Sequence, residues 1–547
     1  MRAILGFVLL TFFVSTAIGQ HQHGNKTTKV VELHPGLGNY HHPITTKSAE
    51  AQIYFDQGLT LLYGFNHDEA ARYFQHAAEL DPEAAMPYWG IALSTGPNYN
   101  DSAVDPNRAK TTYGAVRNSL ERATRASARE QDYIRPLAKR YPSTNPKSNW
   151  KKFHLEYSNA MRAVVKKYPD DLDAATLFAE SLMMLRPWQL WTADGKPAPG
   201  TLELVAVLES VLRRDPNHPG ANHFYIHAVE ASPNLERAIP SAERLMTLVP
   251  GAGHLVHMPG HIFLQTGDYE LAAKTNVNAS QADKAFVERS GATGVYPLMY
   301  WTHNIHFIPY ARAQQGRYDE ARQAAQEMAR NVGAADLQMQ MLEGFHLYPL
   351  TVDLRFHRWD DILKAADPGP ERKLHRAFRH YARAMALAGQ GKLAEAAAER
   401  KQFGALRKAV PPQSQFIINN KSSDILALAA AILDAQFAWA RGEKEKSLEE
   451  WRRAVKLESN IQYDEPPAWF YPVRQSLAAA LLRSGRPKEA ESVFRTAIEK
   501  QPRDGRLLFG LWQSLTAQKR DSEAMLVEQQ FVAAWKDATV KLHIEDL

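Results

Sequence analysis

The sequence predicts an all-α protein built as a solenoid of antiparallel helix pairs, on three observations. Beyond residue 50 the apolar residues recur at helical spacing, with no convincing alternating strand and no Gly-rich phosphate loop. A small residue recurs 34 positions apart, from Ala238 to Ala272 and again from Ala490 to Ala524. The chain has 547 residues, which is too long for one compact core unless it is a repeat array.

The first twenty residues predict a secretory signal peptide and not part of the fold. Arg2 supplies a positive charge, residues 4–14 are mostly apolar, and residues 17–19 are mostly small, as at a cleavage point. An uncleaved anchor is the alternative. No other stretch reaches 18 apolar residues, so no membrane span is expected. We therefore expect an exported protein, periplasmic or secreted, whose residues 21–50 form a His-containing segment that is extended or disordered.

Composition excludes several classes of function. Lys and Arg number 65 against 60 Asp and Glu, a net charge of +5 with no basic block, so nucleic acid is not an expected partner. Cysteine is absent, which excludes disulfide scaffolds, thiolate metal sites and cysteine nucleophiles. Neither an HExxH nor a GxSxG motif is present. Histidine is abundant, with 21 residues, and its clustering points to imidazole chemistry.

The first repeat covers residues 51–82. Large, small and proline residues stand there at fixed offsets, namely Tyr54, Gly58, Ala70, Phe74, Ala77 and Pro82. This pattern resembles the tetratricopeptide repeat, a 34-residue antiparallel helix pair. The resemblance implies a right-handed superhelix with a concave groove. The phrases NHFYIHAVEAS, GHLVHMPGHIF and YDEPPAWFYPVR are similar to a group of exported bacterial tetratricopeptide-repeat proteins of unsettled function.

The same register predicts the later repeats, which we group as residues 51–214, 215–345 and 346–540. Repeats are expected to start near Ala51, Ala85, Leu172, Pro219, Gly253, Thr302, Glu343, Ala377, Leu428, Tyr471 and Gly505. Three segments break the period: residues 101–150, 186–201 and 286–299. Insertions in solenoids map to loops on one face, often the binding face. Trp188 and Trp191 in the second insertion are expected either to form a lid or to pack between helices.

Seven histidines in the central repeats fall into register with this period. They are spaced i,i+3 or i,i+4, so that each segment presents a pair on one helix face: His223, His227, His254, His257, His261, His303 and His306. His257 and His261 follow His223 and His227 by 34 residues. The family resemblance implies that all seven face the groove.

Two carboxylates and two prolines accompany the cluster. By the same register Glu180 and Glu230 border it and are the candidate catalytic groups. Pro259 and Pro309 fall midway along expected helices, where proline kinks the helix. Such kinks would aim His257, His261 and His306 at a shared centre. The alternative is that these helices simply start later.

The cluster predicts a transition-metal site in the groove. Imidazoles with nearby carboxylates suit Zn, Cu, Fe or Ni better than Mg or Ca, and we expect copper or zinc. We expect His223, His227, His257, His261 and His306 to approach one another, with His303 and Glu230 in or near the same site. The alternatives are a metal-free groove that binds a peptide or protein partner, and incidental packing. Whether the site is catalytic stays open at this stage.

Overall fold

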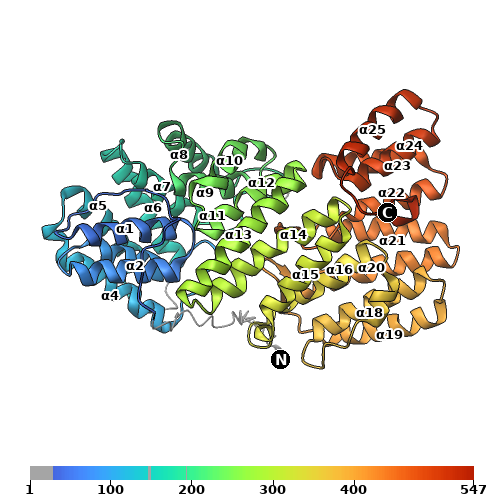
Figure 1. The fold of residues 1–547 in the computed structure, drawn as a ribbon, viewed down its shortest axis with the longest axis horizontal. Coiled ribbons are helices and arrows are strands. Elements are labelled where there is room, and N and C mark those ends of the chain that lie inside the picture. Colours follow the sequence, from blue (N-terminus) through green and yellow to red (C-terminus); the bar gives the residue numbers. More distant parts are fainter. Residues whose placement is uncertain (1–28, 146–148, 193) are drawn as a thin grey trace, which may run out of the picture.

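The computed structural model describes residues 29–145, 149–192 and 194–547, coloured along the chain in Figure 1. The predicted signal peptide, residues 1–20, lies outside the described residues, as do residues 21–28 of the predicted His-containing segment. The remainder is a succession of antiparallel helices stacked side by side along the molecule (Figure 1). The predicted all-α superhelical solenoid of helix pairs is confirmed.

The helices of the first part run from the blue to the blue-green region of Figure 1. They are α1 (Ala49–Tyr63), α2 (His67–Leu80), α3 (Met86–Thr95), α4 (Pro106–Arg122), η1 (Ala123–Arg125), α5 (Ala128–Arg140), α6 (Trp150–Lys167), α7 (Leu172–Met183) and α8 (Thr201–Arg214). Within the 101–150 segment that breaks the period, residues 106–122 and 128–140 form helices α4 and α5, while the described residues 186–192 and 194–200, between α7 and α8, contain no helix.

The central helices follow, and they carry the predicted histidines. They are α9 (Pro219–Val229), η2 (Leu235–Ala238), α10 (Ile239–Leu248), α11 (Gly253–His257), α12 (Pro259–Thr266), α13 (Tyr269–Ser290), η3 (Tyr296–Trp301), α14 (Thr302–Gln314) and α15 (Tyr318–Val332). The segment η3 is a π-helix that leads directly into α14. The 286–299 insertion thus lengthens α13 and adds this wide turn.

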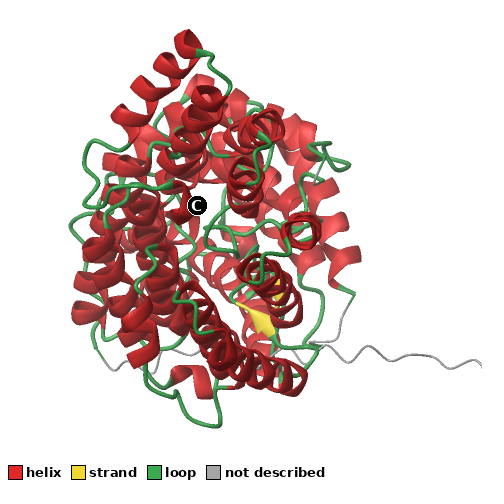
Figure 2. Ribbon diagram, turned by 90° about the vertical axis from the view of Figure 1, so that its right-hand side faces the viewer, coloured by secondary structure: helices red, strands yellow, loops and turns green. Residues whose placement is uncertain are grey.

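The C-terminal helices complete the array, from yellow to red in Figure 1. They are η4 (Ala335–Leu337), η5 (Gln340–Leu347), α16 (Tyr348–Arg355), α17 (Trp359–Lys364), α18 (Lys373–Gly389), α19 (Leu393–Ala409), α20 (Ser422–Ala440), α21 (Lys444–Glu458), α22 (Val473–Arg483), α23 (Pro487–Lys500), α24 (Gly505–Ala517), α25 (Asp521–Ala534) and η6 (Ile544–Asp546). Within the described residues the only sheet is an antiparallel pair of two-residue strands, β1 (Gln415–Phe416) and β2 (Asn420–Lys421), drawn in yellow in Figure 2.

Several predicted repeat starts coincide with observed helix starts. Helices begin at Leu172, Pro219, Gly253, Thr302 and Gly505. The starts expected near Ala377 and Leu428 lie inside their helices, which begin at 373 and 422. A polar first turn precedes the apolar register residues in both cases, and that turn carries no repeat signature. The position expected at 343 falls in the 3₁₀ segment η5 before α16.

The buried apolar side chains form two large cores that meet at α14. One core extends from Leu37 to Ala311 and includes Phe307 of α14, while the other extends from Ile305 to Leu547. Helix α14 thus packs into both cores at once, and each of its thirteen residues is buried. The predicted division of the chain at residues 215 and 346 stays a prediction.

The described part of the N-terminal segment is extended and packed against the repeats. Tyr40 donates its hydroxyl to Asp173 Oδ1 at 2.7 Å, and His42 Nδ1 lies 2.7 Å from Asp173 Oδ2. Tyr63 of α1 donates to the same carboxylate at 2.5 Å. Asp173, in the first turn of α7, therefore binds residues 40–42 and α1 to the second half of the first core.

The C-terminal repeats return to contact the central ones. The segment between α21 and α22 reaches α12, where Gln265 donates to Glu465 Oε1 at 2.9 Å. Arg506 of α24 donates to the carbonyl of Ala313 at 2.9 Å, and Thr539 N donates to Gly316 O at 3.1 Å. Residues about two hundred positions apart in sequence are therefore neighbours.

One helix among the described residues reaches the length and hydropathy of a membrane span. It is α20, Ser422–Ala440, and 56% of that window is buried inside the protein. Burial of this kind is what a core helix of a repeat array shows. Length and composition alone therefore do not make α20 a membrane helix.

Candidate metal centre

Six of the seven predicted histidines come together between three neighbouring helical segments. Helix α9 supplies His223 and His227, and α14 supplies His303. The other three lie on the segment formed by α11 and α12. Five of the six side chains are 0 to 3% exposed, and His303 is 8% exposed. The cluster therefore lies inside the molecule and not on an open surface.

The histidines form two triads that share no residue. We call His223, His227 and His254 the first triad, and His257, His261 and His303 the second triad. Within each, one ring nitrogen per histidine lies within 4.8 Å of the other two. A third grouping, His227 with Glu230 and His261, draws one histidine from each triad. Among the described residues these are the groups able to surround an ion.

Local sequence explains how α11 and α12 present three of these rings. The helical path breaks at Met258, so that α11 ends at His257 and α12 starts at Pro259, the first position of a helix where proline is well tolerated. Met258 itself keeps right-handed helical angles. Pro259 therefore follows a break in the helical path, as expected of a kink, and it also begins a helix, as the alternative of a later start expected. Pro309 lies inside α14, which continues past it without a break.

Glycine at 260 has a steric reason. A Cβ atom there would collide with the side-chain amide of Asn276 on α13. The absence of a side chain lets Asn276 Oδ1 approach to 2.7 Å from His257 Nδ1, while Asn276 Nδ2 donates to the carbonyl of Ala272 at 2.8 Å. The bond to Ala272 fixes which amide atom faces the histidine.

Four of the six histidines engage an oxygen atom through Nδ1. His223 donates to the carbonyl of Tyr63 at 2.5 Å, and His257 lies against Asn276 as described. Glu230 accepts from both His227, at 2.9 Å, and His261, at 2.7 Å. Each of these bonds places the proton on Nδ1 and leaves Nε2 as a lone pair. Metal-ligating histidines are oriented in this way in proteins.

The nitrogens that remain are buried and lack partners. Among the described residues, no hydrogen-bond partner is found for Nε2 of His223, Nε2 of His227, either nitrogen of His254, or Nδ1 of His303. An unsatisfied buried polar atom costs about 1–3 kcal/mol, so native interiors rarely tolerate several together. Every histidine of the first triad thus has at least one unpartnered ring nitrogen, which suits the triad to a ligand that accepts lone pairs.

Burial favours the neutral form of five of the six imidazoles. It lowers the pKa of His223, His254, His257 and His303 well below 6.5, and the neighbouring imidazoles lower each further. His261 shifts in the same direction, although Glu230 opposes the effect of burial there. Neutral imidazole is the form that binds metal ions. Protons therefore compete weakly for these sites near neutral pH.

Two buried carboxylates border the cluster, and they differ in ionisation. Burial alone would raise the pKa of Glu230, but His227 and His261 outweigh it and the pKa lies below its usual 4.5. Burial raises the pKa of Glu465 well above 4.5, and the charge of Glu230 raises it further. Glu465 contacts Nδ1 of His261, the same atom that Glu230 accepts from.

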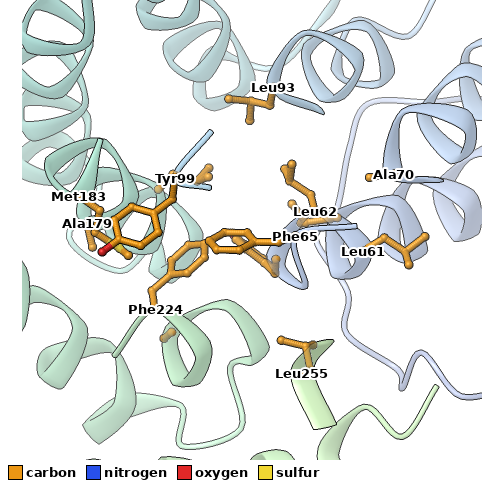
Figure 3. Close-up of a cluster of buried hydrophobic side chains, with 14 of the residues drawn as sticks. Leu61, Leu62, Phe65, Ala70, Leu93, Tyr99, Ala179, Met183, Phe224 and Leu255 are labelled. Atoms are coloured by element: carbon orange, nitrogen blue, oxygen red, sulfur yellow. The ribbon is translucent and has the colours of Figure 1, made fainter. Parts of the chain in front are cut away.

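Aromatic rings cover one side of the first triad. Phe65, in the turn between α1 and α2, lies 4.4 Å from His223, 5.7 Å from His227 and 5.6 Å from His254, measured between ring centroids. Figure 3 shows the Phe65, Tyr99 and Phe224 rings gathered where these helices meet. Such rings exclude water from the nitrogens on this side.

A cavity of about 350 Å³ opens onto the cluster, and Phe65 is one of the residues that line it. His227 and His254 of the first triad line it together with His261 and His303 of the second. Trp188, from the second insertion, also lines it and stands edge-on to His227 at 5.7 Å. Trp191 instead donates to the carbonyl of Ala228 at 2.7 Å and packs between helices. Packing is thus observed for Trp191, and a lid role for Trp188 stays a prediction.

Two of the expected site residues are not in the cluster. The ring of His306 stands edge-on to Tyr348 at 4.2 Å and to Phe345 at 5.5 Å, both in the second core, and its centroid lies 6.4 Å from that of His303. Helix α14 begins at the expected Thr302, but the ring beside His257 is that of His303, at 4.8 Å, and not that of His306. Glu180 is bound by Arg140 at 2.8 and 2.9 Å and is not available to the histidines.

Sequence reasoning missed three partners of the cluster. Glu465 lies in the YDEPPAWFYPVR segment, about two hundred residues beyond His261 in the sequence. Asn276 sits one turn beyond the register alanine of α13, and the Tyr63 carbonyl belongs to the end of α1. Spacing within one segment carries no signal for these contacts. The glycine in HMPGH was the only local sign that a side chain approaches closely.

Comparison with known proteins supports the repeat architecture at both ends of the array. The tetratricopeptide repeat family matches residues 51–83 and residues 476–539. No curated protein matches the chain.

Solved structures of low similarity cover most of the chain. The APC/C hetero-tetramer Cut9–Hcn1 is 12% identical with a TM-score of 0.29, over 91% of this chain and 75% of that one. Yeast Tom70 is 11% identical with a TM-score of 0.28, over 88% and 90%. The human IFIT1 dimer with m7Gppp-AAAA is 12% identical with a TM-score of 0.31, over 90% and 92%. Likenesses this distant do not bear on the function of the chain.

Proposed function

The chain is a tetratricopeptide-repeat protein, and we propose that its central histidine cluster binds a transition metal, copper or zinc, inside the solenoid. The observation that carries the proposal is the pairing of ring nitrogens. Four histidines fix one nitrogen against an oxygen and turn the other toward the shared space. That is the orientation of histidines that ligate metals, with the outer hydrogen bond setting the tautomer.

The donor set favours copper or zinc over harder cations. All six inner donors are imidazoles, and no carboxylate other than Glu230 and Glu465 contacts them among the described residues. Magnesium and calcium prefer oxygen donors, whereas imidazole suits zinc, copper, iron and nickel. The lowered pKa values of the histidines support binding at neutral pH, because no proton has to be displaced from them.

The adjacent cavity extends the proposal to a catalytic role. Four of the six histidines line the cavity, so an ion held by them has a position open to a small molecule. An ion of this kind supplies Lewis-acid activation of bound water or substrate. The chain's part in such a reaction is to keep the imidazoles neutral, to pack Phe65 against the first triad, and to hold Glu465 beside the site.

A metal-free scaffold is the second candidate function. Tetratricopeptide-repeat grooves serve partner proteins and peptides in general, and amide side chains such as Asn66, Asn98 and Asn100 line the same cavity. A peptide held there would form hydrogen bonds to these amides and to the unpartnered imidazole nitrogens.

We further propose, from the predicted signal peptide, that the protein acts outside the cytoplasm. The mass of the mature chain tests this proposal, because cleavage of the signal peptide lowers it.

Elemental analysis of the purified full chain tests the metal proposal. Wild type is expected to retain copper or zinc in stoichiometric amount after dialysis, and the variant His257→Ala, His261→Ala to retain far less. A matched control is His346→Ala, His375→Ala, because these two rings stack 6.2 Å apart outside both triads. Equal and negligible metal in all three proteins, after loading with either ion, would favour the scaffold.

A further inference from the structure

We infer that the cluster holds two metal ions side by side, one in each triad, with Glu230 as the carboxylate that orients both. The inference rests on the proposed function, since it specifies how many ions the same histidines take. The two triads share no residue, and each offers three nitrogens. Three protein ligands with one open position is a usual arrangement for a reactive zinc or copper ion.

One ion cannot use all six imidazoles. Metal–nitrogen bonds are about 2.0–2.1 Å long, so two ligands of one ion lie at most about 4.2 Å apart. The nitrogens within each triad are within 4.8 Å, which small ring rotations can close, but His223 and His303 belong to no common group among the described residues. The six histidines therefore divide into two coordination sets.

The two sets are close neighbours. Ring centroids of His227 and His261 lie 5.6 Å apart, and those of His254 and His257 lie 5.5 Å apart. Each pair takes one ring from each triad. Two ions bound in the triads would consequently face each other across a short gap, and both would face the cavity that four of these histidines line.

Glu230 connects the two sets without occupying either. Its Oε1 accepts from His227 and its Oε2 from His261, so one carboxylate orients one ligand of each triad. Glu230 is 2% exposed, and Glu465 also contacts the imidazole of His261. Two buried cations need compensating negative charge nearby, which Glu230 supplies. Glu230 is thus a positioning residue for both ions.

A single-ion arrangement is the competing possibility. His227, Glu230 and His261 can surround one ion only by turning to it the atoms that now form the Glu230 hydrogen bonds. That arrangement leaves His223, His254, His257 and His303 outside the site. The two arrangements therefore differ in stoichiometry and in which substitutions abolish binding.

Metal titration of the full-length protein separates them. Protein stripped with chelator and dialysed is titrated with Cu²⁺ and, separately, with Zn²⁺, and bound metal is counted. Wild type should bind two equivalents. Two double variants should each bind one equivalent. The first combines His223→Asn with His254→Asn, and the second combines His257→Asn with His303→Asn. The half-field EPR signal of a close Cu²⁺ pair should appear in wild type and vanish in both variants.

Glu230→Gln provides the test of the shared carboxylate. Loss of an outer hydrogen-bond partner typically weakens metal affinity about 10–100-fold, and here both equivalents should weaken together. One equivalent in wild type that persists in both double variants and is lost in Glu230→Gln would overturn the two-ion inference and leave a single-ion site. No bound metal in folded wild type, as judged by circular dichroism, would overturn the proposed function itself.

Discussion

The Nε2 atoms of His257 and His261 lie 2.7 Å apart, although both rings already engage an oxygen through Nδ1. If both protons reside on Nδ1, two lone pairs face each other in a buried site. A cation between them, either a proton or a metal ion, removes that repulsion. Burial lowers the pKa of both histidines, which makes the proton the weaker of the two candidates near neutral pH.

Removal of metal should therefore destabilise the protein. An ion that binds only the folded state stabilises it by about 2.7 kcal/mol at a free concentration of 100 Kd. Chelator is expected to lower the melting temperature of metal-loaded wild type at pH 7.5, and to leave that of His257→Ala, His261→Ala nearly unchanged. Differential scanning fluorimetry checks this. The same chelator response in both proteins would contradict the role of these histidines.

His303 and His306 offer a comparison within one helix. They lie three residues apart on α14, yet His303 belongs to the second triad and His306 packs against Tyr348. The variant His303→Gln should lose metal, whereas His306→Gln should keep the full wild-type amount. Elemental analysis of the two variants checks the difference. Metal loss in His306→Gln alone would mean that His306, and not His303, is the ligand that α14 supplies.

Glu465 should contribute to metal affinity although it lies in the C-terminal half of the chain. Its side chain contacts His261 and accepts from Gln265. Substitution Glu465→Gln preserves shape and removes an acid that can ionise beside a bound cation, so affinity should fall about 10–100-fold. Competition with a coloured chelator measures it. Glu343→Gln, a buried carboxylate elsewhere that accepts from His375 N, is the matched control and should bind metal as wild type does.

Asp173 should be one of the most sensitive single positions for stability. It is buried and engages two tyrosine hydroxyls and His42. Removal of one partner from a buried charged network costs about 3–5 kcal/mol. Urea denaturation of Asp173→Asn should show that loss, whereas Asp170→Asn, whose carboxylate is exposed beside Arg214, should change little. Coincident unfolding midpoints would contradict the role given to Asp173.

Stability should fall on acidification below pH 6.5. Burial lowers the pKa of His154 and His306 to about 3 and that of His34 and His375 to about 4. The unfolded chain therefore binds more protons than the folded one between pH 6.5 and those values, and each unit corresponds to about 1.4 kcal/mol per group. Melting temperatures at pH 7.5, 6.5, 5.5 and 4.5 check the trend, with His306→Gln expected to flatten it. A melting temperature that rises on acidification would contradict it.

The parts of the fold that follow from neighbouring residues could be predicted from the sequence. Pro219 and Gly505 begin helices because a capping residue, His218 or Asp504, stands directly before each of them. The i,i+4 spacing likewise placed His223 beside His227, whose ring centroids lie 4.9 Å apart, since this pair depends on one helix alone.

The remainder depends on contacts that no local pattern encodes. His306 was misplaced because its count along the repeat does not report how α14 is rotated where it follows the π-turn of η3. Glu465 was missed because the array curves until residues two hundred apart meet. Curvature of a solenoid accumulates from small rotations at every repeat interface, and sequence spacing does not report those rotations.

The meeting of the C-terminal and central repeats changes how the protein would respond to mechanical force. An open repeat array stretches like a spring, because each repeat contacts only its neighbours. Here the bonds from Gln265 to Glu465 and from Arg506 to Ala313 join distant turns of the coil. A pull on the two ends must first break these bonds, so extension should begin with one abrupt step and not with gradual uncoiling. The histidine cluster lies beside the contact of Gln265 with Glu465, and breaking that contact would move Glu465 away from His261.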